Sequence, residues 1–166
     1  MRTDKVYLVG FMGAGKTSLA RELGRRLGWK VEDVDVQIES RERRAIREIF
    51  AQSGEAYFRT LERAVVRDLL PLRHAVVATG GGTFVEADTR AAMLADGVVF
   101  WIDVPFQALL GRIPLDGSRP LAPNRVQMEQ LYLSRLPAYA QAHVRLDAAR
   151  QPLGELAEFI VEWLGA

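Results

Sequence analysis

The sequence contains no cysteine and only three lysines, against nineteen arginines. The missing cysteine excludes a disulfide scaffold, a thiolate metal site and a cysteine nucleophile. The formal net charge is +1, so no broad surface of one sign is expected to bind nucleic acid. No apolar run approaches the length of a transmembrane helix, so no membrane span is expected either.

The remaining composition is that of one globular domain. At 166 residues with 49% hydrophobic residues, the chain is long enough to bury a core by itself, so we expect a single domain over 1–166 and a monomer. The first apolar segment, residues 6–9, leads directly into a glycine-rich motif and leaves no room for an export signal. We therefore expect a cytoplasmic protein.

The strongest local motif lies at residues 10–17, which read G-F-M-G-A-G-K-T. This run fits G-x-x-x-x-G-K-[ST], the phosphate-binding P-loop. Its glycines allow successive backbone N–H groups to face one anion. Lys16 can reach the β- and γ-phosphates of a nucleotide, and the Thr17 hydroxyl can bind Mg²⁺. The alternative is a glycine-rich turn that binds nothing, which a preceding strand and a following helix disfavour.

Apolar runs and helical periodicity alternate along the rest of the chain. Strands are expected at about 6–9, 30–34, 75–78, 98–102 and 144–146. Helices are expected at about 16–27, 35–44, 45–52, 55–72, 86–95, 105–112, 125–136 and 153–164. Residues 113–124 hold three prolines and a glycine, which are incompatible with regular structure. The alternation predicts an α/β fold with a parallel sheet, whose ligands bind beyond the carboxyl ends of the strands.

Two aspartates follow the second expected strand. If that strand continues through Asp33 and Asp35, both side chains leave it on the same face. Such a pair can hold Mg²⁺ through water and orient or deprotonate an attacking hydroxyl. The alternative is a helix start with Asp35 as the N-cap. The neighbouring P-loop favours the catalytic interpretation.

Glycines and arginines supply the other candidate groups. Gly80–Gly82 follows the third strand, and three glycines exceed what a turn needs, so their N–H groups are expected to contact a ligand. Arg119 lies in the proline-rich segment, where it suits either closure over phosphates or a flexible surface loop. From the helical pattern alone, Arg59 is a surface partner of Glu62, and Arg135 is a surface residue near a helix C-terminus.

Six motifs occur in a fixed order: G-F-M-G-A-G-K-T at 10–17, D-V-D-x-x-I-E at 33–39, F-R-x-x-E at 58–62, G-G-G at 80–82, R-P-L at 119–121 and R-L-P-A-Y at 135–139. In this order and spacing they resemble the shikimate kinase family and span nearly the whole chain. The P-loop alone is shared by many nucleoside triphosphatases, so the combination carries the resemblance.

The resemblance implies a three-layer P-loop kinase fold of the nucleoside monophosphate kinase type. It implies a five-stranded parallel sheet in the order 2-3-1-4-5, a mobile lid at about 113–124 and a substrate-binding helical region at about 35–62. It also implies ATP and Mg²⁺, and transfer of a phosphoryl group to the 3-hydroxyl of shikimate in the pathway to aromatic amino acids.

The resemblance further implies site roles. For the nucleotide it implies Gly13, Ala14, Gly15, Lys16, Thr17, Ser18, Arg112 and Arg119, of which Lys16 and Arg119 are also catalytic. For Mg²⁺ it implies Thr17 and Asp33. For shikimate it implies Asp35, Phe50, Phe58, Arg59, Gly80, Gly81, Gly82 and Arg135, with Asp35 also as the base. A small carboxylate substrate needs planar bidentate donors, so Arg59 and Arg135 move from the surface to the site.

The chain departs from the family pattern in three places. Gln141 replaces a usual glutamate, Ala122 replaces a leucine, and Ile113-Pro114 follows Arg112. These departures bear on the lid and on contacts to adenine. Two other functions stay open: the same fold acting on another acceptor such as gluconate or a nucleotide, and a shikimate-sensing domain without turnover.

Overall fold

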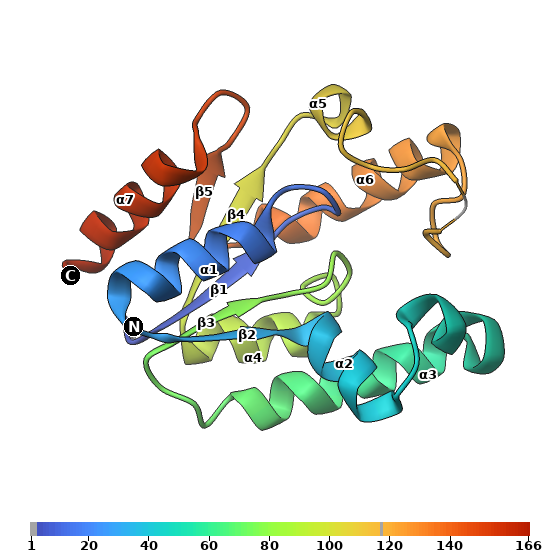
Figure 1. Cartoon of the computed structure of the whole chain (residues 1–166), viewed down its shortest axis with the longest axis horizontal. Helices are drawn as coiled ribbons and strands as arrows, with labels where there is room; N and C mark the ends of the chain where they lie inside the picture. The colour runs from blue at the N-terminus through green and yellow to red at the C-terminus, as the bar shows by residue number, and fades with distance from the viewer. Residues whose placement is uncertain (1–2, 117) are drawn as a thin grey trace.

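A central parallel sheet divides the computed structural model into three layers, and the description covers residues 3–116 and 118–166. The strand order is β2-β3-β1-β4-β5, which confirms the expected fold (Figure 1). The strands are β1 (Lys5–Val9), β2 (Lys30–Asp33), β3 (Ala75–Ala78), β4 (Val98–Asp103) and β5 (Val144–Asp147).

The helices cover both faces of this sheet. They are α1 (Lys16–Leu27), α2 (Val34–Glu42), α3 (Ile46–Leu69), α4 (Ala87–Asp96), α5 (Phe106–Leu110), α6 (Arg125–Tyr139) and α7 (Leu153–Leu164). In the view of Figure 1, α1 lies in front of the strands next to α7, and α4 and α6 pass behind them. Within residues 3–116 and 118–166, no helix is both long and apolar enough to cross a membrane.

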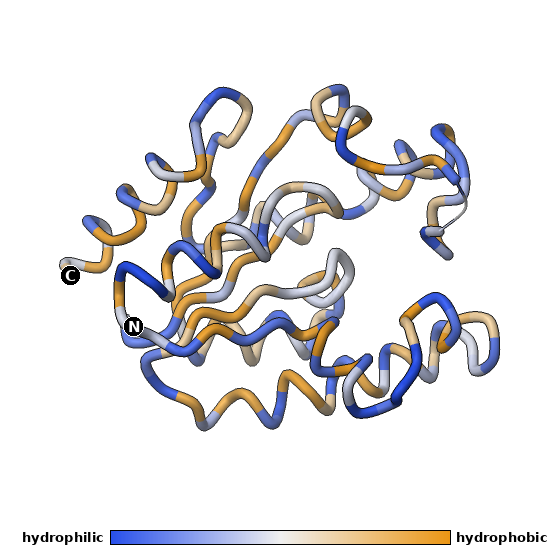
Figure 2. Tube along the Cα trace, in the orientation of Figure 1, coloured by the Kyte–Doolittle hydropathy of each residue, from blue (hydrophilic) through white to orange (hydrophobic). Residues whose placement is uncertain are grey.

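The core follows the central strands. All five residues of β1 are buried, because helices cover both faces of a parallel sheet. Figure 2 shows the same pattern, with apolar residues gathered on the strands and on the inward sides of the helices. β1 is the third of the five strands in the sheet order, which places the P-loop that follows it at the middle of the sheet.

Three element boundaries differ from the sequence prediction. β2 ends at Asp33, and α2 begins at Val34, because the Asp33 carboxylate accepts a hydrogen bond from the Val36 N–H at 3.2 Å and caps the helix. The expected break near residue 54 appears inside α3, where Gly54 has φ 81°. α6 extends to Tyr139, because Pro137 lies in its last turn and interrupts little of it.

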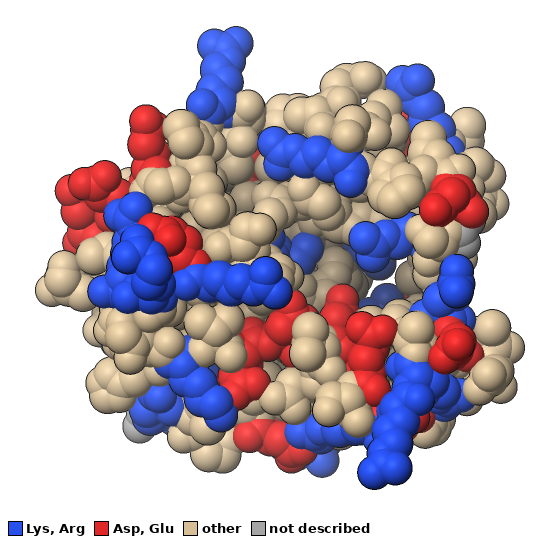
Figure 3. Space-filling view, in the orientation of Figure 1, with Lys and Arg blue, Asp and Glu red and all other residues tan. Residues whose placement is uncertain are grey.

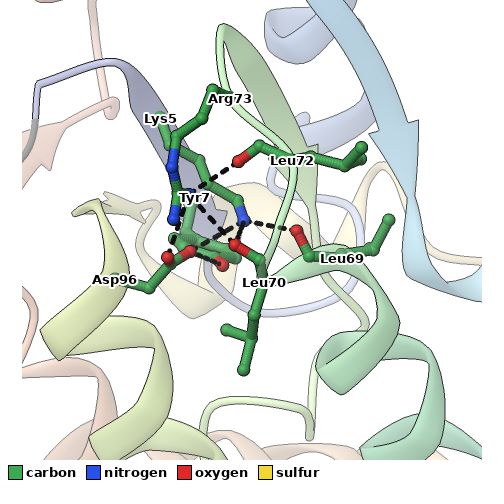
Figure 4. Close-up of polar contacts among 7 residues, drawn as sticks. All are labelled: Lys5, Tyr7, Leu69, Leu70, Leu72, Arg73 and Asp96. Carbon is green, nitrogen blue, oxygen red and sulfur yellow. Dashed lines mark hydrogen bonds and ion pairs between the residues drawn. The ribbon is translucent and has the colours of Figure 1, made fainter.

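A buried polar cluster lies at the amino end of the sheet, opposite the strand ends that carry the P-loop (Figure 4). The fully buried Lys5 ammonium contacts Asp96 at 2.7 Å, and it also donates to the backbone carbonyls of Leu69 and Leu70. The Tyr7 hydroxyl donates to Asp96 at 2.6 Å, and Arg73 contacts the other carboxylate oxygen at 3.1 Å.

The charges of this cluster depend on one another. Burial lowers the pKa of Lys5, and the adjacent Asp96 carboxylate opposes that shift. Burial also raises the pKa of Tyr7, with the Asp96 charge acting in the same direction. For Asp96, burial alone would raise the pKa, but hydrogen bonds from Lys5 and Tyr7 outweigh it, so the pKa is lowered. The cluster joins β1 to the ends of α3 and α4.

We predict that Lys5→Met destabilises the protein by about 3 kcal/mol, since it removes the fully buried ammonium that pairs with the 11% exposed Asp96 side chain and leaves two carbonyls short of a partner. Urea unfolding at pH 7 measures this loss. The matched control is Lys30→Met. The Lys30 side chain is 64% exposed, and its partner Glu32 keeps a hydrogen bond from Gln37 at 2.6 Å, so its loss is expected to stay below about 1 kcal/mol. Equal losses in the two variants would contradict the role given to the cluster.

Candidate active site

A cleft of about 790 Å³ lies beyond the carboxyl ends of the strands. Figure 3 shows the hollow, with acidic side chains along its lower edge and basic side chains around it. The predicted site residues that line it are Gly13, Gly15, Lys16, Thr17, Ser18, Asp33, Asp35, Phe50, Phe58, Arg59, Gly80, Gly81, Gly82, Arg112, Arg119 and Arg135. The fold thus brings together residues that are up to 122 positions apart, from Gly13 to Arg135.

The P-loop connects β1 to α1 as the motif predicts. Gly13 has φ 78° and Gly15 has φ 99°, a region that L-residues with side chains rarely adopt. α1 begins directly at Lys16, so its N-terminal N–H groups face the cleft side of the loop. Ala14 is buried and does not line the cleft, and its N–H donates to the Phe11 carbonyl at 3.2 Å. A nucleotide contact by Ala14 stays a prediction.

Lys16 is a buried cation on the floor of the cleft. Its ammonium donates to the carbonyls of Gly10 and Phe11 at 2.7 and 2.9 Å. Burial lowers its pKa to about 8, with the Asp35 charge opposing this shift and the Arg135 charge adding to it. An anion placed over the loop would favour the charged form of this lysine.

The Asp33 carboxylate accepts two hydrogen bonds, one on each oxygen. One carboxylate oxygen caps α2, and the other accepts a hydrogen bond from the Thr17 hydroxyl at 2.9 Å. A hydroxyl and a carboxylate beside a phosphate-binding loop are the hard oxygen ligands that Mg²⁺ prefers. In the described ranges, no cluster of three histidine or acidic side chains forms a separate metal site.

Asp35 does not share a strand face with Asp33, and it is not the N-cap of α2. Both expectations are wrong, because β2 ends at Asp33 and this residue takes the capping role itself. Asp35 lies instead in the first turn of α2, where it lines the cleft. One of its oxygens is buried and has no hydrogen-bond partner among the described residues. Burial raises the pKa of Asp35 to about 6, and the charges of Glu62 and Asp33 add to this shift.

Arg135 is buried and Arg59 is largely buried, so their assignment to the surface is wrong. Arg59 has a 12% exposed side chain and contacts Glu62 at 2.8 Å, as its helix spacing predicts. Arg135 is 6% exposed, and no carboxylate of the described chain lies within 4.0 Å of it. Its guanidinium lies 5.7 Å from the centre of the Phe11 ring, and burial lowers its pKa. A buried guanidinium without a carboxylate partner is suited to an anionic ligand.

The triple glycine after β3 is explained by close approach. A Cβ on Gly81 would lie 2.7 Å from an Arg135 nitrogen, and one on Gly82 would lie 2.5 Å from the Arg59 nitrogens. A Cβ on Gly80 would lie 2.8 Å from the buried Asp35 oxygen. Each glycine therefore faces one charged side chain of the site. A residue with a Cβ at any of the three positions would force that charged group to move.

Two phenylalanines form the apolar wall of the cleft. The rings of Phe50 and Phe58 have centroids 4.8 Å apart, and Phe58 is buried. The Arg59 guanidinium lies 5.3 Å from the Phe58 ring centre. The wall thus places an apolar surface next to a cation, as a small cyclic anion requires.

The proline-rich segment borders the cleft through both predicted arginines. Arg119 is exposed and lines the cleft, and Arg112 donates to the Gly13 carbonyl at 3.4 Å. Ile113 is buried against Gly13, and Ala122 is also buried. No helix or strand occurs in the described part of 113–124, as predicted, and Gly117 lies outside the described residues. Movement of this segment as a lid stays a prediction.

Sequence reasoning missed the role of Glu62. This residue is 1% exposed, and it accepts hydrogen bonds from Arg59 at 2.8 Å and from the Thr83 hydroxyl at 2.7 Å. The pairing with Arg59 was visible in the helix spacing, but the burial was not. Gln141 does not line the cleft; it accepts a hydrogen bond from Arg90 at 3.1 Å, so this departure lies away from the cleft.

Known proteins match the chain over most of its length. A family model described as shikimate kinase matches residues 12–165. A shikimate kinase of Geobacillus kaustophilus is 40% identical over 167 residues, covering 98% of this chain and 89% of the relative. The solved structure of a shikimate kinase from Acinetobacter baumannii in complex with shikimate aligns with a TM-score of 0.91 at 33% identity, covering 97% and 92% of the two chains.

A more distant structural match shows the fold alone. A gluconokinase from Sinorhizobium meliloti aligns with a TM-score of 0.63 at 17% identity, covering 99% of this chain and 94% of that one. Because identity is so low, this likeness carries no argument for a gluconate acceptor.

We predict that Asp35→Asn stabilises the protein at pH 8. The folded-state pKa of Asp35 is raised from 3.8 to about 6, so its stabilising contribution is present at low pH and is lost as the pH rises through about 6. A neutral amide removes that cost, which is about 3 kcal/mol at pH 8 and about half of that at pH 5. Urea unfolding at both pH values measures the difference, and an equal effect at the two would contradict the account of Asp35.

Proposed function

This chain belongs to the shikimate kinase family, and from that premise we propose that it transfers the γ-phosphoryl group of ATP to the 3-hydroxyl of shikimate. The products are ADP and shikimate 3-phosphate. One observation carries the proposal for this chain: two arginines with little exposure, Arg135 and Arg59, lie over adjacent glycines in the same cleft as a P-loop and an unpartnered carboxylate oxygen.

The nucleotide occupies the P-loop side of the cleft. The N–H groups of the loop and the start of α1 bind the β- and γ-phosphates. Lys16 and Arg119 neutralise the charge that spreads over the transferring group, and Arg112 contacts the adenine side. Lys16 reaches the phosphates by exchanging the carbonyls of Gly10 and Phe11 for phosphate oxygens, which keeps its hydrogen-bond donors satisfied.

The residues beside the P-loop fit Mg²⁺. Thr17 would hold the ion directly and Asp33 would hold it through water. Their side-chain oxygens lie 2.9 Å apart at the loop, so one ion can be near both. Bound Mg²⁺ supplies neutralisation of the β- and γ-phosphate charge. Few protein ligands are needed, because Mg²⁺ usually keeps several waters and takes substrate phosphates as ligands.

Shikimate occupies the other side of the cleft. Arg59 and Arg135 bind its carboxylate through planar, charge-assisted hydrogen bonds, which Arg135 provides without a competing carboxylate. Phe50 and Phe58 cover the ring, and the backbone of Gly80–Gly82 holds the hydroxyls. The unpartnered oxygen of Asp35 accepts the hydrogen bond of the 3-hydroxyl.

Asp35 also acts as the base. The hydroxyl oxygen forms a bond to the γ-phosphorus, the bond to the departing ADP oxygen breaks, and the hydroxyl proton passes to Asp35. With a pKa of about 6, Asp35 is ionised at neutral pH and still basic enough to take this proton in the transition state. Positioning and charge neutralisation supply the rest of the rate enhancement.

We further propose a cytoplasmic monomer. Every group assigned to ATP, Mg²⁺ or shikimate comes from one chain, so no second copy is needed to complete the site. ATP as a substrate favours the cytoplasm.

Release of ADP from MgATP by the purified protein tests the function. Shikimate, gluconate and a panel of nucleoside monophosphates are compared in parallel. We expect turnover with shikimate alone. Turnover with gluconate or a nucleotide instead would contradict the acceptor, and measurable shikimate binding without turnover would favour a sensing domain, although Lys16, Asp33 and Asp35 are all in place.

We predict that Gly82→Ala separates binding from folding. The three nearest atoms that a Cβ at this position would meet belong to the end of the Arg59 side chain and not to backbone, so the fold survives, but the guanidinium must move from its place beside Glu62. We expect the KM for shikimate to rise by about 10- to 100-fold, the loss of a charged hydrogen bond, with the KM for ATP unchanged. The control is Gly154→Ala on α7, whose nearest neighbour would be 3.6 Å away. A normal KM for shikimate in Gly82→Ala would remove Arg59 from the carboxylate site.

A further inference from the structure

The loop after β3 is tied to the end of α6 by one side chain. Tyr139, the last residue of α6, is 1% exposed, and its hydroxyl donates a hydrogen bond to the Gly81 carbonyl at 2.5 Å. Burial raises the pKa of Tyr139 to about 12, with the Arg135 charge opposing the shift. The hydroxyl therefore keeps its proton and donates at neutral pH. None of the roles assigned above uses this tyrosine.

This bond fixes the orientation of a peptide group in the acceptor site. The Gly81 carbonyl and the Gly82 N–H belong to the same planar peptide and point in opposite directions. Holding the carbonyl therefore also directs the N–H. In the part of the chain that the structure describes, the Gly82 N–H has no acceptor, so it is available to a ligand in the cleft that Gly82 lines.

The same hydroxyl sets the position of the loop relative to Arg135. Arg135 and Tyr139 are four residues apart on α6, which puts both side chains on one face of the helix. The Arg135 guanidinium lies over Gly81, 2.7 Å from where a Cβ would stand, while the tyrosine holds the carbonyl of that same residue. Two side chains of α6 thus meet the same residue of the loop, Gly81, which fixes the position of the loop relative to the helix.

Other contacts of the loop do not replace this bond. Arg90 on α4 donates to the carbonyls of Phe84 and Val85 at 3.1 and 2.8 Å, further along the chain. The carbonyls of Gly80 and Gly82 accept backbone bonds from within the loop itself. Of the described side chains, only Tyr139 bonds to a carbonyl of Gly80–Gly82.

We propose that Tyr139 is a positioning residue of the acceptor site, whose hydroxyl orients the Gly81–Gly82 peptide and holds it beneath Arg135 for the carboxylate-bearing substrate. This proposal rests on the proposed function. The tyrosine acts through its hydroxyl, while its ring packs on Trp101 with centroids 5.9 Å apart. Replacing tyrosine by phenylalanine therefore removes the orienting bond and keeps the packing.

The test compares Tyr139→Phe with Tyr132→Phe. Tyr132 lies on the same helix, and its hydroxyl also donates to a backbone carbonyl, that of Val104, at 3.3 Å. We expect Tyr139→Phe to raise the KM for shikimate about 5-fold or more, the worth of one hydrogen bond, and to leave the KM for ATP within about 2-fold. The control variant is expected to change neither KM by more than about 2-fold. Thermal unfolding of both variants shows any general loss of stability.

The outcomes separate the two proposals. If the unaltered protein phosphorylates shikimate but Tyr139→Phe keeps its KM for shikimate, the positioning role is overturned and the proposed function stands. An equal rise of both KM values, or the same shikimate effect in Tyr132→Phe, also overturns the positioning role, because a merely structural loss would have that form. If the unaltered protein neither binds nor phosphorylates shikimate, the proposed function fails, and the positioning role fails with it.

Discussion

The site depends on the close approach of two guanidinium groups to the glycine backbone at residues 81 and 82. Arg135 and Arg59 lie where the side chains of residues 81 and 82 would stand, and both come from helices distant in sequence. Such an approach needs glycine at both positions, a loop held in place and arginines held against it. Glu62 holds Arg59 in place, because it accepts hydrogen bonds from both Arg59 and Thr83. The parallel sheet brings the loop and the helices that carry the arginines to one edge.

The polar side chains at the two ends of the sheet differ in whether they have partners within the protein. At the amino end, Lys5, Tyr7, Arg73 and Asp96 satisfy one another, and the cluster ties helices to β1. At the carboxyl end, Asp35 keeps an oxygen without a partner, and Arg135 has no carboxylate nearby among the described residues. Buried polar groups without an oppositely charged partner cost stability, and a bound ligand can supply that partner. One buried oxygen of Asp4, at the amino end, also lacks a hydrogen-bond partner among the described residues, so it is the cleft lined by Asp35 and Arg135 that marks the carboxyl end as the functional one.

Much of the fold could be predicted from local sequence, because periodicity and glycines are local signals. The five strands, the P-loop, the break at Gly54 and the irregular segment after Arg112 all follow from such patterns. The start of α2 could not, since the choice between Asp33 and Asp35 as its cap depends on where β2 leaves the sheet. The pattern of a helix face put Arg59 and Arg135 on the surface, because the loop that buries them comes from elsewhere in the chain; only the resemblance to a family corrected that. Glu62 and Tyr139 needed the structure, as their contacts are with Thr83 and Gly81.

The central claim is that the arginine pair binds the carboxylate of the acceptor. A crystal structure of the protein with shikimate and MgADP tests it most directly. The account predicts the carboxylate within hydrogen-bond distance of both Arg59 and Arg135, with the 3-hydroxyl on the unpartnered oxygen of Asp35. A shikimate bound with its carboxylate away from these arginines, or with the 3-hydroxyl away from Asp35, would contradict it.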